Sequence, residues 1–143
     1  MNQDTIYLLR ECNAGFKSAT NSMEQVIPYI SDEKLLSIIN EYNDQHIKLG
    51  DECHQMLNEY HEEEKDAKVT AKAFSWLSTE TKLLLNHDAS KIAEIMLDGC
   101  HMGIKSVSRY LNQYKAASDE SINLAKKLVQ LEQEFMNALL EFL

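Results

Sequence analysis

The chain has 143 residues, of which 44% are hydrophobic and 26% charged, a balance typical of a globular domain rather than of a disordered chain. Its formal net charge of -9 argues against nucleic acid and anionic membranes as partners, because their phosphate groups would be repelled. Four glycines and one proline are too few for a turn-rich β protein and favour long helices, which we expect to form a single domain over residues 1–143.

The sequence also predicts where the protein works. Its first residues, MNQDTIYLLRE, lack the basic and then apolar segments of a signal peptide. No apolar run approaches the roughly 20 residues that a membrane span requires. Three cysteines without close C-x-x-C spacing do not make a disulfide framework or a zinc ribbon, and they fit reduced thiols in a cytoplasm. We therefore expect a cytoplasmic protein.

The first predicted helix runs from about Thr5 to Ile27, where apolar residues recur at three- and four-residue steps. Pro28 ends or kinks this helix, since it cannot continue the hydrogen-bond ladder. Ser31 is expected to cap a second helix that extends to about His61. The apolar stripe of the second helix has the heptad-like spacing that helix bundles use.

The segment after the second helix, HEEEKDAK over residues 61–68, is interpreted as a solvated acidic connector, with a cation site as the alternative. A shorter helix is predicted from about Ala67 to Leu85, with Trp76 on its apolar face. The sequence NHDAS then breaks this helix, and Asp88 is expected to cap the next one.

The third long helix is predicted from about Ala89 to Tyr114, and Ser118 is expected to cap a fourth that continues to the C-terminus. Two helical hairpins joined by a connection of about 25 residues are typical of a ferritin-like bundle, because that connection must cross the bundle. The sequence thus predicts an all-α, ferritin-like four-helix bundle with an extra short helix in the long connection. An up-down-up-down bundle is the alternative.

Glu132 interrupts the apolar face of the fourth helix in the stretch LVQLEQEFMNALL. At about 100° per residue its side chain falls among those of Leu128, Leu131 and Phe135. A buried charge without a partner is strongly unfavourable. His46 is the expected neighbour, because it lies within about 20° of the centre of its own apolar stripe. At 1.5 Å of rise per residue, both residues also lie about 22 Å from a bundle end.

Two interpretations of His46 and Glu132 stay open. The first is a structural hydrogen bond that fixes the helix register. The second is a functional site, either for proton transfer or for a divalent metal, since imidazole and carboxylate ligands suit iron, manganese and zinc. A metal would need at least one further inward ligand, and Cys100, Tyr42 and Tyr110 are the candidates.

A short repeat gives a weaker metal hypothesis. DECH at residues 51–54 and DGCH at residues 98–101 each hold a carboxylate and a histidine three residues apart, a ligand spacing found in di-iron bundles. Helical periodicity directs Asp51 and Asp98 to solvent, with His54 and His101 at the flank of the apolar face. Such pairs could bind metal only at the surface or across a subunit contact.

Cysteines and glycines within the helices are interpreted mainly as packing residues. Cys12, Cys53 and Cys100 lie on apolar faces, where free cysteine behaves as a small hydrophobic residue. A thiol redox pair is the alternative, and it requires two of these cysteines in contact. Gly99 and Gly103 provide either close helix approach, room for a bulky neighbour or space for a ligand.

The chain resembles a bacterial ferritin-like family that is catalogued only as a domain of unknown function. The resemblance rests on CNAGFKSA, on FSWLSTETKLLLNHDASKIAEIMLDGC and on the helix order, with Asn13-Ala14-Gly15 similar to the family's Asn-x-Gly. It implies a four-helix bundle without an established activity. Di-iron ferritins also need Glu-x-x-His motifs, which this sequence lacks, and Glu11 is expected to point outward. Of such a site, only His46 and Glu132 remain as inward ligands.

We therefore expect a non-enzymatic structural, interaction or binding module, with at most a degenerate metal site at His46 and Glu132. One alternative is a ferritin-like protein that binds iron, manganese or zinc and has redox activity. A thiol-based redox protein is another. The expected partners are further copies of this chain or another protein, and neither nucleic acid nor a membrane.

Overall fold

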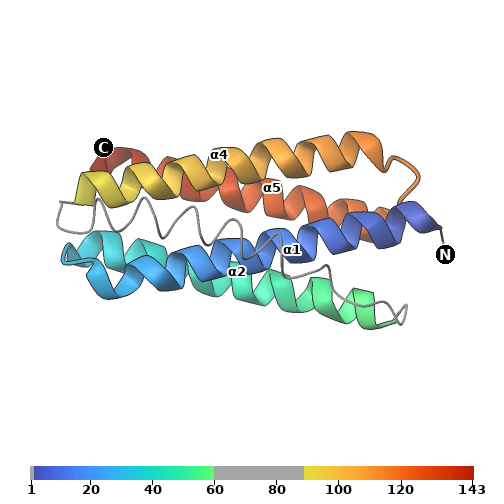
Figure 1. Ribbon diagram of the computed structural model, residues 1–143, viewed down its shortest axis with the longest axis horizontal. Coiled ribbons are helices and arrows are strands. Elements are labelled where there is room, and N and C mark those ends of the chain that lie inside the picture. Colours follow the sequence, from blue (N-terminus) through green and yellow to red (C-terminus); the bar gives the residue numbers. More distant parts are fainter. Residues whose placement is uncertain (1, 60–88) are drawn as a thin grey trace.

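The computed structural model describes residues 2–59 and 89–143, and the regular elements of this part of the chain are all helices. An elongated bundle of long helices forms the fold (Figure 1). These helices are α1 (Gln3–Val26), α2 (Glu33–Glu59), α4 (Ala89–Gln113) and α5 (Asp119–Leu139). The predicted all-helical bundle is thereby confirmed. The predicted helix over residues 67–85 and the predicted cap Asp88 lie outside the described residues.

The four helices are arranged so that helices adjacent around the bundle are antiparallel, while the diagonal pair α1 and α5, which also makes contacts, is parallel (Figure 1). Within the hairpins α1 packs on α2 and α4 packs on α5, and between the hairpins α1 contacts α4 while α2 contacts α5. Glu59 and Ala89 lie at opposite ends of the bundle, so α2 and α4 run in the same direction on diagonally opposed positions (Figure 1). The sequence leaves this direction open. Within the described residues, no helix combines the length and apolar character needed to cross a membrane.

The helix ends follow local sequence signals, with one correction. Pro28 lies in the short turn η1 (Ile27–Tyr29) that directly follows α1, as predicted. The cap of α2 is Asp32 and not the predicted Ser31, because Asp32 Oδ1 accepts the backbone N–H of Leu35 at 2.9 Å. The predicted cap Ser118 is confirmed, since its hydroxyl oxygen accepts a backbone N–H from the first turn of α5.

The bundle core consists of two apolar clusters. Along α5, Leu128 belongs to the cluster nearer the N-terminus of the chain and Phe135 belongs to the cluster nearer the α1–α2 turn. Glu132 lies between these two residues in the sequence and is itself buried. The polar layer that contains Glu132 therefore separates two apolar halves of one core. After α5, the chain forms a second short turn, η2 (Leu140–Phe142).

Candidate site at the His46–Glu132 pair

His46 of α2 and Glu132 of α5 meet inside the bundle, where Nε2 of the imidazole contacts Oε1 of the carboxyl group. Exposure is 0% for His46 and 6% for Glu132, so both groups of this contact are buried. Antiparallel packing of α2 on α5 brings the two residues together at mid-bundle. The contact predicted from helical periodicity is present.

Tyr42 fixes the orientation of the His46 ring. Nδ1 of His46 lies 2.7 Å from the backbone carbonyl oxygen of Tyr42, one helical turn earlier. A carbonyl oxygen can only accept a hydrogen bond, so Nδ1 carries a hydrogen and donates it. The Tyr42 ring stacks on Phe135 at a centroid distance of 5.0 Å, and Phe135 in turn meets the His46 ring edge-on at 6.3 Å. Neighbouring residues thus fix both the position of Nδ1 and the orientation of the His46 ring plane.

Because Nδ1 of His46 carries a hydrogen, only Nε2 of His46 and the carboxyl group of Glu132 can share a further proton. A hydrogen bond between Nε2 and Oε1 requires one further proton, either on the imidazole of His46 or on the carboxyl group of Glu132. The first form is an imidazolium–carboxylate pair and the second is two neutral groups. The net charge is zero in both forms. The core therefore contains no uncompensated charge, which would be strongly destabilising.

Cys100 of α4 is the third polar side chain in this layer. Burial, followed by the charge of Glu132 and a hydrogen bond with it, raises the pKa of the Cys100 thiol. Cys100 is therefore a neutral thiol beside the carboxyl group at physiological pH. Of the other predicted ligands, Tyr42 contributes its backbone carbonyl to His46, and Tyr110 lies with Glu11 further along the bundle.

The described residues do not assemble a larger ligand set. Within residues 2–59 and 89–143, no three side chains of His, Cys, Asp or Glu are grouped so that they could hold a metal ion. Nε2 of His46 and Oε1 of Glu132 are directed at each other, so a metal would have to displace the proton between them. The donor set fits a hydrogen-bonded pair better than a metal centre.

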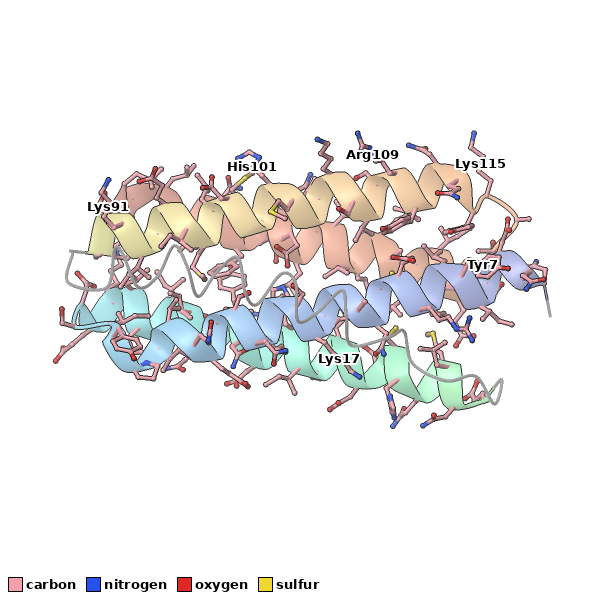
Figure 2. All side chains as sticks on the ribbon, viewed as in Figure 1. Tyr7, Lys17, Lys91, His101, Arg109 and Lys115 are labelled. Atoms are coloured by element: carbon pink, nitrogen blue, oxygen red, sulfur yellow. The ribbon has the colours of Figure 1, made fainter. Side chains whose placement is uncertain are left out.

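The carboxylate and histidine residues of the DECH and DGCH repeat lie towards the surface, as helical periodicity predicts, whereas Cys53 and Cys100 are buried. Asp51 and Asp98 are exposed and His54 is half-buried. His101 is exposed and extends from the outer side of α4, in the same direction as Arg109 (Figure 2). The carboxylate–histidine pairs of the repeat therefore do not contribute to the His46–Glu132 layer, and Cys100 is the residue of the second copy that does.

Cys12 and Cys53 are free thiols in the cluster nearer the N-terminus. The Cys53 thiol donates a hydrogen bond to the carbonyl oxygen of Leu9 at 3.3 Å, and burial raises the pKa of Cys53 to about 12. Burial, followed by the charges of Cys53 and Glu11, raises the pKa of Cys12. Both thiols are thus protonated at neutral pH, which makes them poor nucleophiles.

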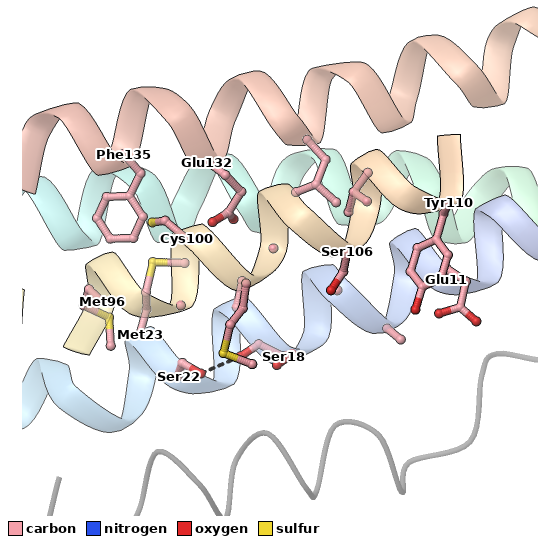
Figure 3. Close-up of a pocket in the computed structure, with 18 of the residues that line it drawn as sticks. Glu11, Ser18, Ser22, Met23, Met96, Cys100, Ser106, Tyr110, Glu132 and Phe135 are labelled. Carbon is pink, nitrogen blue, oxygen red and sulfur yellow. Dashed lines mark hydrogen bonds between the residues drawn. The ribbon is translucent and has the colours of Figure 1, made fainter. Parts of the chain in front are cut away.

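A cleft of about 220 Å³ lies between α1 and α4, with Glu132 and Phe135 of α5 among its lining residues (Figure 3). Its two walls are formed largely by small side chains. These include Ala14, Gly15, Ser18 and Ser22 of α1 and Gly99 and Gly103 of α4. Space for a ligand at Gly99 and Gly103 is one of the alternatives that the sequence leaves open, but the α1 wall is not predicted, although small residues recur on α1 at three- and four-residue steps. That spacing was interpreted only for the large apolar residues.

Glu11 requires a correction at one end of this cleft. The sequence interpretation directs it outward, yet Glu11 is half-buried, lines the cleft and lies beside Tyr110 of α4 (Figure 3). Burial, followed by a hydrogen bond with Glu11 and its charge, raises the pKa of Tyr110. The prediction fails because α1 packs against both α2 and α4, whereas a single inward face was assumed.

Comparison with protein-family models, with curated proteins and with solved structures found no match. The resemblance to a ferritin-like family therefore stays a prediction, and the chemistry of the site is derived from its own geometry.

Proposed function

We propose that this chain is a ferritin-like helical module that binds a partner or ligand without catalysing a reaction, and that the His46–Glu132 pair is a structural contact in it. The observation that carries this proposal is that both ring nitrogens of His46 are engaged inside the protein, by the Tyr42 carbonyl and by Glu132. A histidine that serves as a metal ligand or proton carrier needs one nitrogen directed at the metal or the substrate.

The helix directions support the ferritin-like part of this proposal. In a bundle of that type the second and third long helices run in the same direction, because the chain between them crosses the full length of the bundle. The shared direction of α2 and α4 agrees with this topology (Figure 1). An up-down-up-down bundle would need α2 and α4 to be antiparallel.

A divalent-metal site at His46 and Glu132 is the second candidate, and the position of Cys100 favours it. The Cys100 thiol lies beside Glu132, and the three side chains come from three different helices, although they would have to move to form a metal-binding group within the described residues. These donors suit zinc or iron when the thiol is deprotonated. Metal uptake would release the proton shared by the pair, and it would weaken as the pH falls.

Metal content and stability, measured on the same variants, separate the two candidates. Untagged wild-type protein, His46→Ala and Glu132→Ala are incubated with iron, manganese and zinc, and bound metal is quantified by mass spectrometry after gel filtration. A structural pair predicts less than about 0.1 metal per chain in all three proteins and a loss of about 3–5 kcal/mol of unfolding free energy in the variants. Ser37→Ala, at an exposed position on α2, is the matched control.

Near-stoichiometric metal in the wild type that both variants lose would overturn the structural assignment. Iron and oxygen reactivity would then become the activity to measure. The proposed module also works in a reducing cytoplasm and associates with itself or with another protein. Sedimentation of the full chain tests that self-association, and the free state of the buried cysteines is compatible with that compartment.

A further inference from the structure

The cleft between α1 and α4 has the size of a small-molecule site. Its volume of about 220 Å³ exceeds that of an engineered apolar cavity of about 150 Å³ that is known to bind benzene. One six-membered ring with a few additional atoms would therefore fill it. The walls leave this space open because their side chains are small: a Cβ atom added at Gly99 would meet no atom within 4 Å.

The lining of the cleft is apolar at one end and has a carboxyl group at its centre. Met23, Met96 and Phe135 gather on one side of Glu132, and Glu11 with Tyr110 lies on the other side (Figure 3). A mostly hydrophobic pocket with few polar groups binds mostly apolar ligands, and the polar groups set the orientation of the ligand. Glu132 is the carboxyl group closest to the apolar end, where the Ser22 hydroxyl already donates a hydrogen bond to the Ser18 carbonyl oxygen.

The second carboxyl oxygen of Glu132 is the atom that a ligand would contact. Oε1 is engaged by His46, whereas Oε2 faces α4, where a Cβ atom built on Gly103 would lie 3.5 Å from it. Gly103 lines the cleft, so its lack of a side chain leaves Oε2 uncovered on that side. A carboxylate oxygen is a strong acceptor, which suits a ligand that brings a single O–H donor.

The charge of the pair determines the charge of the ligand. Glu132 and His46 together have zero net charge, because one proton lies between them. An ammonium group on Oε2 would add an uncompensated positive charge to a buried layer, and a carboxylate ligand would be repelled by Glu132 and by Glu11. A neutral hydroxyl group adds a hydrogen bond without changing the charge.

We propose that the cleft between α1 and α4 binds a small, neutral, mostly apolar molecule with one hydroxyl group, which donates a hydrogen bond to Oε2 of Glu132. This inference rests on the proposed function, since Oε2 of Glu132 is turned towards the cleft only while His46 holds Oε1. The Cys100 thiol also hydrogen-bonds with Glu132, and the two lone pairs of a carboxyl oxygen leave room for a second donor from a ligand. Phenol is the probe, and toluene is its control, because the two molecules have the same shape and differ only in the hydroxyl group.

The full chain is titrated with phenol or toluene at neutral pH. Calorimetry and NMR shifts of isotope-labelled protein measure the binding. We expect saturable binding with phenol bound about tenfold tighter than toluene, the gain of one hydrogen bond to a carboxyl oxygen. Ser18→Leu and Ser106→Leu fill the cleft from its α1 and α4 walls and should each abolish binding. Ser37→Leu makes the same change at an exposed position on α2 and should leave binding intact.

Four outcomes would overturn the inference. Equal affinities for phenol and toluene would mean that Glu132 is not the contact, and tighter binding of benzylammonium or benzoate would mean that the site selects a charged ligand. Phenol binding that survives in both Ser18→Leu and Ser106→Leu, with circular dichroism confirming that they are folded, would place the site elsewhere. Absence of phenol binding also overturns it, while the stability of His46→Ala and its metal content would still test the proposed function separately.

Discussion

Gly103 of α4 lies against the carboxyl group of Glu132 of α5, and a Cβ atom at position 103 would lie 3.5 Å from both Cδ and Oε2. This is an ordinary van der Waals distance, so a methyl group would fit without displacing Glu132. The glycine therefore leaves Oε2 uncovered and is not required by the backbone geometry.

Gly103→Ala should stabilise the protein. Alanine is favoured over glycine in a helix interior by about 1 kcal/mol, and the added methyl group makes no clash at position 103. We expect the unfolding free energy to rise by about 0.5–1 kcal/mol in urea denaturation. Gly50→Ala is the comparison, because its Cβ atom would approach Cβ of buried Phe16 to 3.2 Å. A larger gain for Gly50→Ala than for Gly103→Ala would contradict this account.

The His46–Glu132 pair should show strong energetic coupling. His46→Leu leaves a buried carboxyl group without its partner and should cost about 3–5 kcal/mol, whereas Glu132→Leu leaves one imidazole nitrogen unpaired and should cost about 1–3 kcal/mol. The double variant removes both polar groups. Its cost should fall below the sum of the single costs by about 1–3 kcal/mol, measured by a double-mutant cycle in urea.

Glu132→Gln is the control for this cycle. Its amide N–H can donate to Nε2 of neutral His46, which keeps a hydrogen bond but removes the carboxyl group. It should therefore destabilise the protein less than Glu132→Leu. If the two single costs simply add in the double variant, the contact between His46 and Glu132 does not determine their energies, and the structural interpretation of the pair fails.

The His46–Glu132 contact could be predicted from the sequence because it depends on two regular quantities. The rotation per residue places each side chain on the inner face of its helix, and the rise per residue places both at mid-height. Neither quantity depends on whether the hairpins are parallel or antiparallel. The direction of α2 relative to α4 could not be predicted in this way. The pattern of apolar residues along each helix is the same in both topologies, and only the path of the chain between the hairpins distinguishes them.

The α1 wall of the cleft could not be predicted, for a reason that Glu11 illustrates. Sequence periodicity identifies the average inner face of a helix, and Glu11 falls outside that face on α1. The separation between two neighbouring helices depends on side chains from both helices. The small residues of α1 lie across the cleft from Gly99 and Gly103 only once the hairpins are assembled. That assembly determines which glycine faces a carboxyl group and which faces open space.

Stability should decrease at alkaline pH because the buried thiols resist ionisation. Burial raises the pKa of Cys53 from its ordinary value of 9.0 to about 12 in the folded protein. Between these two values the unfolded chain releases the thiol proton and the folded chain keeps it, so the unfolded state becomes more favourable as the pH rises. This one group lowers the unfolding free energy by up to about 1.4 kcal/mol per pH unit, and below about pH 9 it has no effect.

Cys53→Ala tests this dependence. The variant loses packing and is less stable at every pH, but its unfolding free energy should fall less steeply than that of the wild type between about pH 9 and about pH 11 in urea titrations. Burial also raises the pKa values of Cys12 and Cys100, so part of the slope should remain in the variant. Identical slopes for wild type and variant would show that the Cys53 thiol ionises as easily in the fold as in the unfolded chain.

The N-terminal cap of α2 tests whether the hydrogen bond seen in the structure or the capping preference of the residue determines helix stability. Both Ser31 and Asp32 are favourable capping residues, but only Asp32 accepts the backbone N–H of Leu35. Asp32→Ala should lower the unfolding free energy by about 1 kcal/mol, and Ser31→Ala should change it by less than about 0.5 kcal/mol. Ser118→Ala, which removes the cap of α5, should cost about as much as Asp32→Ala. A larger loss for Ser31→Ala than for Asp32→Ala in thermal and urea unfolding would move the start of α2 one residue earlier, to the position that the sequence first suggests.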